Sequence, residues 1–227
     1  MIKEVKECRL CGGKDLTTVL DFGETALANA YTSEEQGVCL KSPLNVFRCD
    51  DCFSFQLKHT VDPEILYKNY LYESSTSQAF KLHFEEYAKT LVNQILCPGD
   101  FVVDIGSNDN ILLKPLKELG MEVLGVEPAK NITSKLTDGI PVVNDFFSTK
   151  MLDKIYRRPK VITCNNCFAH IDDLREIING VKEILSPEGV FVFENAYWLS
   201  TVQGKYFPEK ILVLMSYNQD IIQVFLP

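Results

Sequence analysis

Residues 102–110, Val-Val-Asp-Ile-Gly-Ser-Asn-Asp-Asn, constrain the fold of this chain more than any other stretch. A β-branched run leads into a cluster of turn-forming residues, and apolar residues then follow at helical spacing at Ile111, Leu112 and Leu116. Strand, tight turn and helix in this order open a nucleotide-binding α/β sheet. Gly106 can adopt a positive φ and lets a ligand approach the backbone closely. The stretch therefore predicts an α/β fold with a Rossmann-like sheet and a ligand at this turn.

The side chains of the loop indicate which ligand it binds. A dinucleotide-binding loop carries glycines where the pyrophosphate meets the helix N-terminus, whereas this chain has Asn108 and Asp109 there. S-Adenosylmethionine (SAM) has no phosphate but carries an ammonium and a sulfonium group, which suit the carboxylates of Asp104 and Asp109. Glu127 ends the next strand-like run, about 20 residues on, where an acid can accept hydrogen bonds from both ribose hydroxyls. We therefore expect SAM here; the alternative is an ordinary turn with a solvated acid.

Polar residues end each of five strand-like runs, at Gly106, Glu127, Asn144-Asp145, Asn165-Asn166 and Glu194-Asn195. Because ligands of open α/β sheets bind at the carboxyl ends of the strands, we expect these ends to converge on one crevice. In that crevice Asp145 would accept a hydrogen bond from the adenine amine, Phe146 would pack on the adenine ring, and Asn166 would complete the cofactor site. His170 is expected either to face the transferable methyl group or to be a hydrogen-bonded structural histidine.

Two Cys-x-x-Cys pairs, Cys8 with Cys11 and Cys49 with Cys52, predict a metal site. Eight cysteines in a chain that does not begin with a secretory signal point to reduced thiols. Two such pairs make a closed tetrahedral four-thiolate zinc site of the structural type. Four unrelated buried cysteines and a redox pair are the alternatives. The third pair, Cys164 with Cys167, has no fourth partner pair and is interpreted as small residues at a strand end.

Length and charge bound the remaining choices. The 227 residues have room for one ordinary domain and a small module, and we expect a zinc-binding module over 1–62, a connector and helix over 63–97 and a SAM-binding domain over 98–227. A net charge of −8 argues against nucleic-acid and anionic-membrane binding. The sequence has no apolar run of membrane-spanning length and no signal peptide, so we expect a cytoplasmic protein.

A polar loop with two tyrosines, residues 70–77, precedes an amphipathic helix. Four hydroxyl residues follow Tyr70 and Tyr72, so the segment is either a substrate loop with phenol and hydroxyl donors or a helix-capping segment. Helical spacing of apolar residues predicts the helix itself over about residues 78–95. His83 lies near the apolar face of this helix, where we expect it to serve packing rather than chemistry.

Short stretches in a fixed order carry a family resemblance over residues 8–207; they are 8–11, 21–24, 49–52, 69–72, 74–77, 104–109, 125–128, 165–173 and 193–194. The chain resembles the sugar C-methyltransferases of deoxysugar biosynthesis, which pair a zinc-binding N-terminal domain with a SAM-binding domain. The resemblance implies methylation of a ring carbon beside a ketone on a nucleotide-linked deoxysugar. In that family a base removes the acidic C–H, an enolate forms, and the carbon attacks the methyl group of SAM, which requires a base and donors for the enolate oxygen.

The chain departs from this family in three ways. Asn110 stands where the family usually has glycine, although asparagine tolerates a positive φ better than most residues. After Phe207 the family carries a Tyr-His-Glu-His stretch with its proposed tyrosine and histidine catalysts, and the matching residues 210–217 here contain no histidine. Full-length members continue into a further C-terminal domain that helps hold the sugar nucleotide, whereas this sequence stops at Pro227.

The last residues still predict a structural element. Residues 211–217 and 221–226 are two apolar runs joined by Asn218-Gln219-Asp220, a pattern typical of a β-hairpin. Many SAM methyltransferase folds close their sheet with such a hairpin. We therefore expect the SAM-binding domain to fold.

The first functional hypothesis is a SAM-dependent C-methyltransferase that acts on a nucleotide-linked keto-deoxysugar. The alternatives are a catalytically weak zinc- and SAM-binding remnant and an O- or N-methyltransferase on another small substrate. The remaining candidates for catalysis are His170, Tyr70 and Tyr72. Because the family's tyrosine and histidine have no counterpart here, we expect SAM binding but weak or absent methylation.

Overall fold

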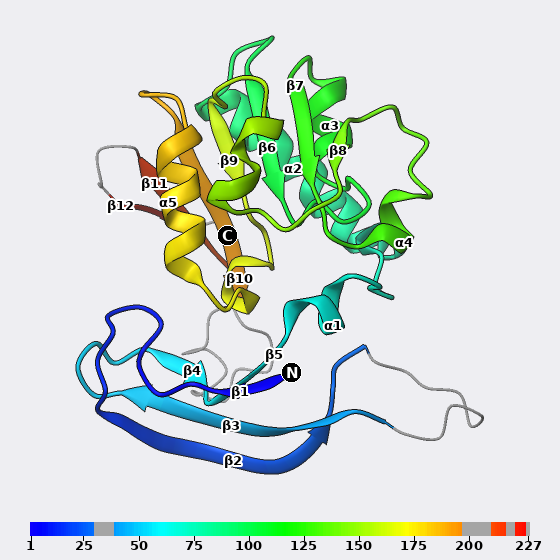
Figure 1. The fold of residues 1–227 in the computed structure, drawn as a ribbon. Helices are drawn as coiled ribbons and strands as arrows, with labels where there is room; N and C mark the ends of the chain where they lie inside the picture. The colour runs from blue at the N-terminus through cyan, green and yellow to red at the C-terminus, as the bar shows by residue number, and fades with distance from the viewer. Residues whose placement is uncertain (30–38, 197–209, 217–220, 226–227) are drawn as a thin grey trace. The chain divides into compact units, whose positions relative to one another are not determined.

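The computed structural model describes residues 1–29, 39–196, 210–216 and 221–225, and the chain forms two compact units (Figure 1). The first unit contains Met1–Tyr72 and Asp172–Arg175, and the second contains Glu73–Ile171 and Glu176–Pro227. Among the described residues, no helix is both long and apolar enough to cross a membrane.

The second unit is built on a seven-stranded sheet in the order β12-β11-β10-β9-β6-β7-β8. Its strands are β6 (Phe101–Ile105), β7 (Glu122–Val126), β8 (Val142–Val143), β9 (Val161–Thr163), β10 (Val190–Ala196), β11 (Lys210–Ser216) and β12 (Ile221–Phe225). The five strands from β10 to β8 are parallel, whereas β11 and β12 pair antiparallel at one edge. This arrangement confirms the predicted Rossmann-like sheet. The antiparallel pairing of β11 with β12 confirms the strand pair of the predicted hairpin, whose connecting residues 218–220 lie outside the described part of the chain.

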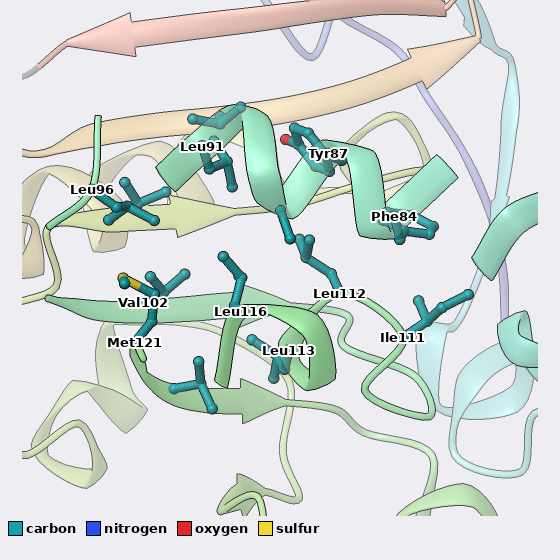
Figure 2. Packing of buried hydrophobic residues seen from close by; sticks show 14 of the residues in the cluster. Phe84, Tyr87, Leu91, Leu96, Val102, Ile111, Leu112, Leu113, Leu116 and Met121 are labelled. Carbon is teal, nitrogen blue, oxygen red and sulfur yellow. The ribbon is translucent and has the colours of Figure 1, made fainter. Parts of the chain in front are cut away.

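Helices cover both faces of this sheet, because its central strands are apolar on both sides. The α-helices are α2 (Gln78–Gln94), α3 (Leu113–Glu118), α4 (Lys130–Thr133) and α5 (Leu174–Ile184), and the 3-10 helices are η2 (Ser74–Thr76), η3 (Thr149–Lys154) and η4 (Phe168–His170). One apolar cluster lies between the sheet and α2 with α3, where Leu91 of α2 and Leu112 belong to the same buried group (Figure 2). A second cluster on the opposite face includes Ile177 and Val181 of α5.

Helix α2 forms where the sequence predicts it. The Ser77 hydroxyl accepts a hydrogen bond from the Phe80 backbone N–H at 3.4 Å and caps the helix, which agrees with one of the two alternatives for this loop. Phe84, Tyr87 and Leu91 recur at helical spacing and are buried against the sheet. The helix therefore presents one fixed face to the strand ends that follow.

The first unit consists of small antiparallel sheets. Strands β2 (Leu16–Ala26), β3 (Lys41–Cys49) and β4 (Phe55–Leu57) form one sheet, and β1 (Ile2–Glu4) pairs with β5 (His59–Val61) in another. A short helix, α1 (Pro63–Tyr67), follows and is capped by Asp62. Most residues of β2 are exposed, so apolar burial in this unit is small.

Candidate functional site

Four cysteine sulfurs meet in the first unit. The Sγ atoms of Cys8, Cys11, Cys49 and Cys52 all lie within 4.8 Å of one another. The Cys8–Cys52 and Cys11–Cys49 sulfur pairs are each 3.6 Å apart. Zinc–sulfur bonds of about 2.3 Å in a tetrahedron place neighbouring sulfurs about 3.8 Å apart, so the four side chains fit a zinc ion. The predicted four-thiolate site is confirmed.

Polar groups donate hydrogen bonds to two of the four sulfurs. The Gln56 side-chain amide donates to the Cys8 sulfur at 2.9 Å, and the Gly13 backbone N–H donates to the Cys11 sulfur at 3.3 Å. Burial alone would raise the pKa of Cys8, but hydrogen bonds, that of Ser54 the largest among them, bring it down to about 5. Cys164 and Cys167 are not part of this group, in line with their interpretation as small residues at a strand end.

The loop after β6 has the backbone conformation that its sequence predicts. Gly106 has a φ of 73°, and a Cβ there would lie 2.8 Å from the Cys167 sulfur, so a side chain does not fit. Asn108 and Asn110 also have positive φ values, of 50° and 63°. Asparagine therefore takes the place of glycine at position 110 without disrupting the loop.

Glu127 links this loop to the end of β7. Its side chain is 5% exposed, and its two carboxylate oxygens accept hydrogen bonds from the backbone N–H groups of Asn108 and Ala129, each at 2.8 Å. Burial raises the pKa of Glu127, while these two bonds act in the opposite direction. Each carboxylate oxygen can accept a further hydrogen bond, so the arrangement remains compatible with ribose hydroxyls.

Asp104 lies at the end of β6 and is buried in the sheet. The Thr163 hydroxyl donates to its carboxylate at 2.6 Å. Burial, together with the negative charge of Glu127, raises the pKa of Asp104 to about 7. Two acids in this setting favour a cationic ligand, because a cation would offset the unfavourable burial of their charge.

Asn108 and Asp109 hold the hydroxyl-rich segment beside the loop. Their side-chain oxygens accept hydrogen bonds from the Ser74 and Ser75 backbone N–H groups, both at 2.9 Å. The second oxygen of Asp109 is buried and has no hydrogen-bond partner within the described residues. A cavity of about 260 Å³ adjoins Asp109 and is lined by further charged side chains, including Lys114.

The remaining predicted cofactor residues lie at the ends of β8 and β9. Asp145 accepts a hydrogen bond from the Phe146 backbone N–H at 2.9 Å and pairs with Lys154 at 2.7 Å. The Asn166 backbone N–H donates to the Glu194 carbonyl at 2.6 Å. The strand ends are thus where the sequence placed them, and the roles of Asp145, Phe146 and Asn166 toward a cofactor stay predictions.

The three predicted catalytic residues lie in different units. Tyr70 and Tyr72 belong to the first unit, where their ring centroids are 6.5 Å apart and the Tyr70 hydroxyl accepts from the Asn29 amide at 3.2 Å. His170 ends η4 in the second unit. Desolvation lowers the pKa of His170, and its ring makes no hydrogen bond or ion pair within the described residues. The alternative of a hydrogen-bonded structural histidine is therefore not supported by the described contacts.

One polar pair, His83 with Glu194, was not predicted from the sequence. His83 of α2 was expected to serve packing, and its ring does pack against Phe84 and Tyr87. The sequence did not predict that its Nε2 also lies 2.6 Å from a carboxylate oxygen of Glu194 on β10. The Tyr87 hydroxyl and the Glu194 backbone N–H both donate to the side-chain oxygen of Asn165, at 3.2 and 3.1 Å. The place of His83 at the edge of the buried helix face, together with a glutamate at a strand end, was the available signal.

Comparison with known proteins agrees with this two-part organisation. Residues 8–67 match a family model described as "Putative zinc binding domain", and residues 80–219 match one described as "Methyltransferase domain". The curated C-methyltransferase NovU of Streptomyces niveus is 31% identical over 214 residues, which are 91% of this chain and 51% of that protein. The chain therefore spans about half the length of this curated relative.

Solved structures with some similarity are methyltransferases. CcbJ of Streptomyces caelestis is 18% identical, with a TM-score of 0.45 over 62% of this chain and 74% of that one. The plantazolicin methyltransferase BpumL, solved in complex with a triazolic desmethylPZN analog and SAH, is 15% identical, with a TM-score of 0.47 over 58% of this chain and 53% of that one. On the strength of the two family matches, the chain belongs to the methyltransferase domain family and carries a zinc-binding domain at its N-terminal side.

Proposed function

We propose that the chain is a SAM-dependent C-methyltransferase that acts on a nucleotide-linked keto-deoxysugar. The observation that carries the proposal is its 31% identity to the C-methyltransferase NovU across 91% of the chain. The acceptor class follows from the resemblance described above and is the part that most needs a test.

The loop and strand ends of the second unit support SAM as the methyl donor. Asp104, Asp109 and Glu127 place three carboxylates around one loop, where a phosphate would be repelled and an ammonium or sulfonium attracted. Gly106 keeps the backbone open to close approach. Glu127 would hold the ribose and Asp109 would face the methionine end. When bound, SAM supplies an electrophilic methyl group.

The four-cysteine site supports a structural role for zinc. All four ligand positions are filled by thiolates, which leaves no open position for a substrate or a water molecule. We therefore assign zinc to the stability of the first unit and not to the methyl transfer.

The second candidate function is a remnant that binds zinc and SAM but turns over little. The observation in its favour is that residues 208–227 contain no histidine, where the resemblance would place a Tyr-His-Glu-His stretch. The rate of methyl transfer separates the two proposals.

The test is a mass-spectrometric assay with SAM and a dTDP-4-keto-6-deoxy sugar, with zinc-loaded protein. The proposal expects a product heavier by one methyl group, with the new carbon bond located by NMR, and less product with Glu127→Ala at the same subsaturating SAM concentration. A matched assay with hydroxyl and amine acceptors tests the O- and N-methyltransferase alternative. Methylation of those acceptors alone would overturn the C-methyltransferase proposal, and SAM binding without any product would favour the remnant.

A further inference from the structure

One face of the central sheet changes from apolar to polar at the carboxyl ends of three neighbouring strands. The residue pairing of β6 with β9 and of β9 with β10 sets Asp104, Thr163 and Val192 side by side. Side chains alternate along a strand, so Glu194 points to the same face as Val192. This is the face that α2 covers, since Val192 belongs to the apolar cluster of α2.

Glu194 is buried beneath α2 and holds His83 by one ring nitrogen. The Glu194 side chain is 1% exposed and that of His83 is 30% exposed, with 2.6 Å between Oε2 and Nε2. An ionised carboxylate can only accept hydrogen bonds, so in the neutral imidazole Nε2–H donates to Glu194 and Nδ1 carries the lone pair. Nδ1 makes no hydrogen bond within the described residues. The ring is thus fixed on one side and available for a proton on the other.

Neighbouring rings and amides hold this pair in one orientation. The His83 ring stacks on Tyr87, with centroids 6.3 Å apart and planes at 20°, and packs edge-on against Phe84. Burial, and next the charge of Glu194, raise the pKa of Tyr87 well above its usual value, so its phenol stays a donor to Asn165. A carboxylate in such a buried position costs desolvation free energy that an apolar residue would avoid, which points to a functional reason.

The pair lies at the ligand-binding edge of the sheet, beside the cofactor loop. The ends of β6 and β10 are separated by two inter-strand spacings, roughly 10 Å. The proposed cofactor residues occupy the ends of β6, β7 and β8, with Asn166 after β9. The end of β10 is the next strand end along the sheet and is left for the methyl acceptor, and Glu194 with His83 lies there.

We propose that His83 is the general base that removes the proton from the acceptor carbon, with Glu194 as its positioning residue. This inference rests on the proposed C-methyltransferase function. In the step, the C–H bond beside the ketone breaks, the proton moves to Nδ1 of His83, and the electron pair stays on the substrate as an enolate. The imidazolium keeps its Nε2–H bond to Glu194 and later returns the proton to solvent, so no further reactant is needed.

The other two histidines lack this arrangement. The sequence has three histidines in total. His59 lies on β5 of the first unit. The ring of His170 makes no hydrogen bond or ion pair with the described residues, so no carboxylate fixes its tautomer there. His83 is the histidine whose described contacts match those of an oriented base.

Proton removal can be measured apart from methyl transfer. The zinc-loaded full chain is incubated in D2O with a dTDP-4-keto-6-deoxy sugar and no SAM, and NMR follows deuterium entering the carbons beside the ketone. We expect exchange with the parent, a loss of about 10²–10⁴-fold with His83→Asn and a loss of at least ~10-fold with Glu194→Gln. His59→Asn is the matched control and should exchange at the parent rate. SAM affinity, measured by calorimetry on each variant, shows that the second unit is folded.

A second readout does not depend on the substrate. Nitrogen-15 NMR of the His83 ring should show the Nε2–H tautomer in the parent and a loss of that preference in Glu194→Gln. Methylation by the parent together with parent-like exchange in a folded His83→Asn would overturn the base assignment and leave the proposed function standing, as would exchange lost only in His170→Asn. A parent that neither exchanges nor methylates would overturn the proposed function and the base role with it.

Discussion

The two units of this protein are each stabilised in a different way. The second unit buries two large apolar clusters, one on each face of its sheet. The first unit buries few apolar side chains, among them Val46 and Phe47, and most of β2 is exposed. Its four clustered cysteines supply what its core lacks, because a unit of this size rarely folds on apolar burial alone. The comparison shows that a structural metal site and an apolar core can each stabilise a folded unit within one chain.

The largest expected effect is the removal of zinc. We expect one zinc per chain, and its loss to a chelator should unfold the first unit, since structural zinc contributes about 10–16 kcal/mol of apparent binding free energy in small zinc domains. The spectroscopic signals of the second unit should persist. Metal analysis and NMR before and after chelation measure both effects.

Cysteine variants provide the control for this prediction. Cys49→Ser should abolish zinc binding, whereas Cys39→Ser and Cys97→Ser should not, because neither residue belongs to the four-cysteine group. A metal-free preparation with an ordered first unit would show that the first unit does not depend on zinc for its stability.

The next effect concerns the apolar core of the second unit. Leu112 is fully buried between the sheet and α2 (Figure 2). Leu112→Ala should lower the free energy of unfolding of this unit by about 2–5 kcal/mol, as the loss of a buried leucine side chain does. Urea denaturation measures the change, and zinc affinity should stay at the parent value. Leu82→Ala, on an exposed position of α2, is the control and should have little effect.

The features that the sequence predicted are those encoded locally. The cysteine pairs, the Gly106 loop and the apolar face of α2 each depend on residues within a few positions of one another, through spacing, backbone preference and helical period. The pairing of His83 with Glu194 joins residues 111 positions apart, and it depends on how α2 lies across β10. The same holds for the contact of Ser74 with Asn108. Such contacts follow from tertiary packing, which the local pattern does not specify.

Polar residues at the site weaken the second unit in a pH-dependent way. The pKa of Asp104 is raised from 3.8 to about 7 in the folded protein. The folded state therefore holds a proton that the unfolded state has released, so stability is greatest below the unfolded pKa and falls as pH rises toward 7. Between pH 5 and 7 this group should remove about 2 kcal/mol, because the slope of about 1.4 kcal/mol per pH unit falls to half as the pH reaches the folded pKa.

Asp104→Asn tests this directly, because it removes the titrating group and keeps an oxygen that can accept from Thr163. Urea denaturation of the zinc-loaded protein at several pH values should give a flatter profile for the variant than for the parent. Identical slopes would show that the burial of Asp104 does not lower the free energy of unfolding of the second unit as pH rises.

The smallest expected effect concerns the affinity for SAM, which is measured separately from folding stability. Glu127 ties the loop after β6 to the end of β7 and is proposed to hold the ribose of SAM. Glu127→Ala should weaken SAM binding by about 1.5–3 kcal/mol, the range for a lost hydrogen bond to a charged group. Glu122→Ala is the matched control, since Glu122 begins the same strand, is exposed and pairs with Arg157 at 2.9 Å. Calorimetry of SAM binding should show a loss for the first variant and parent affinity for the second.

Because Glu127 also accepts two backbone hydrogen bonds, denaturation of both variants is needed to separate loop stability from ribose binding. Equal SAM affinity in Glu127→Ala and the parent would show that Glu127 has only a structural role. The ribose of SAM would then bind elsewhere than at the end of β7.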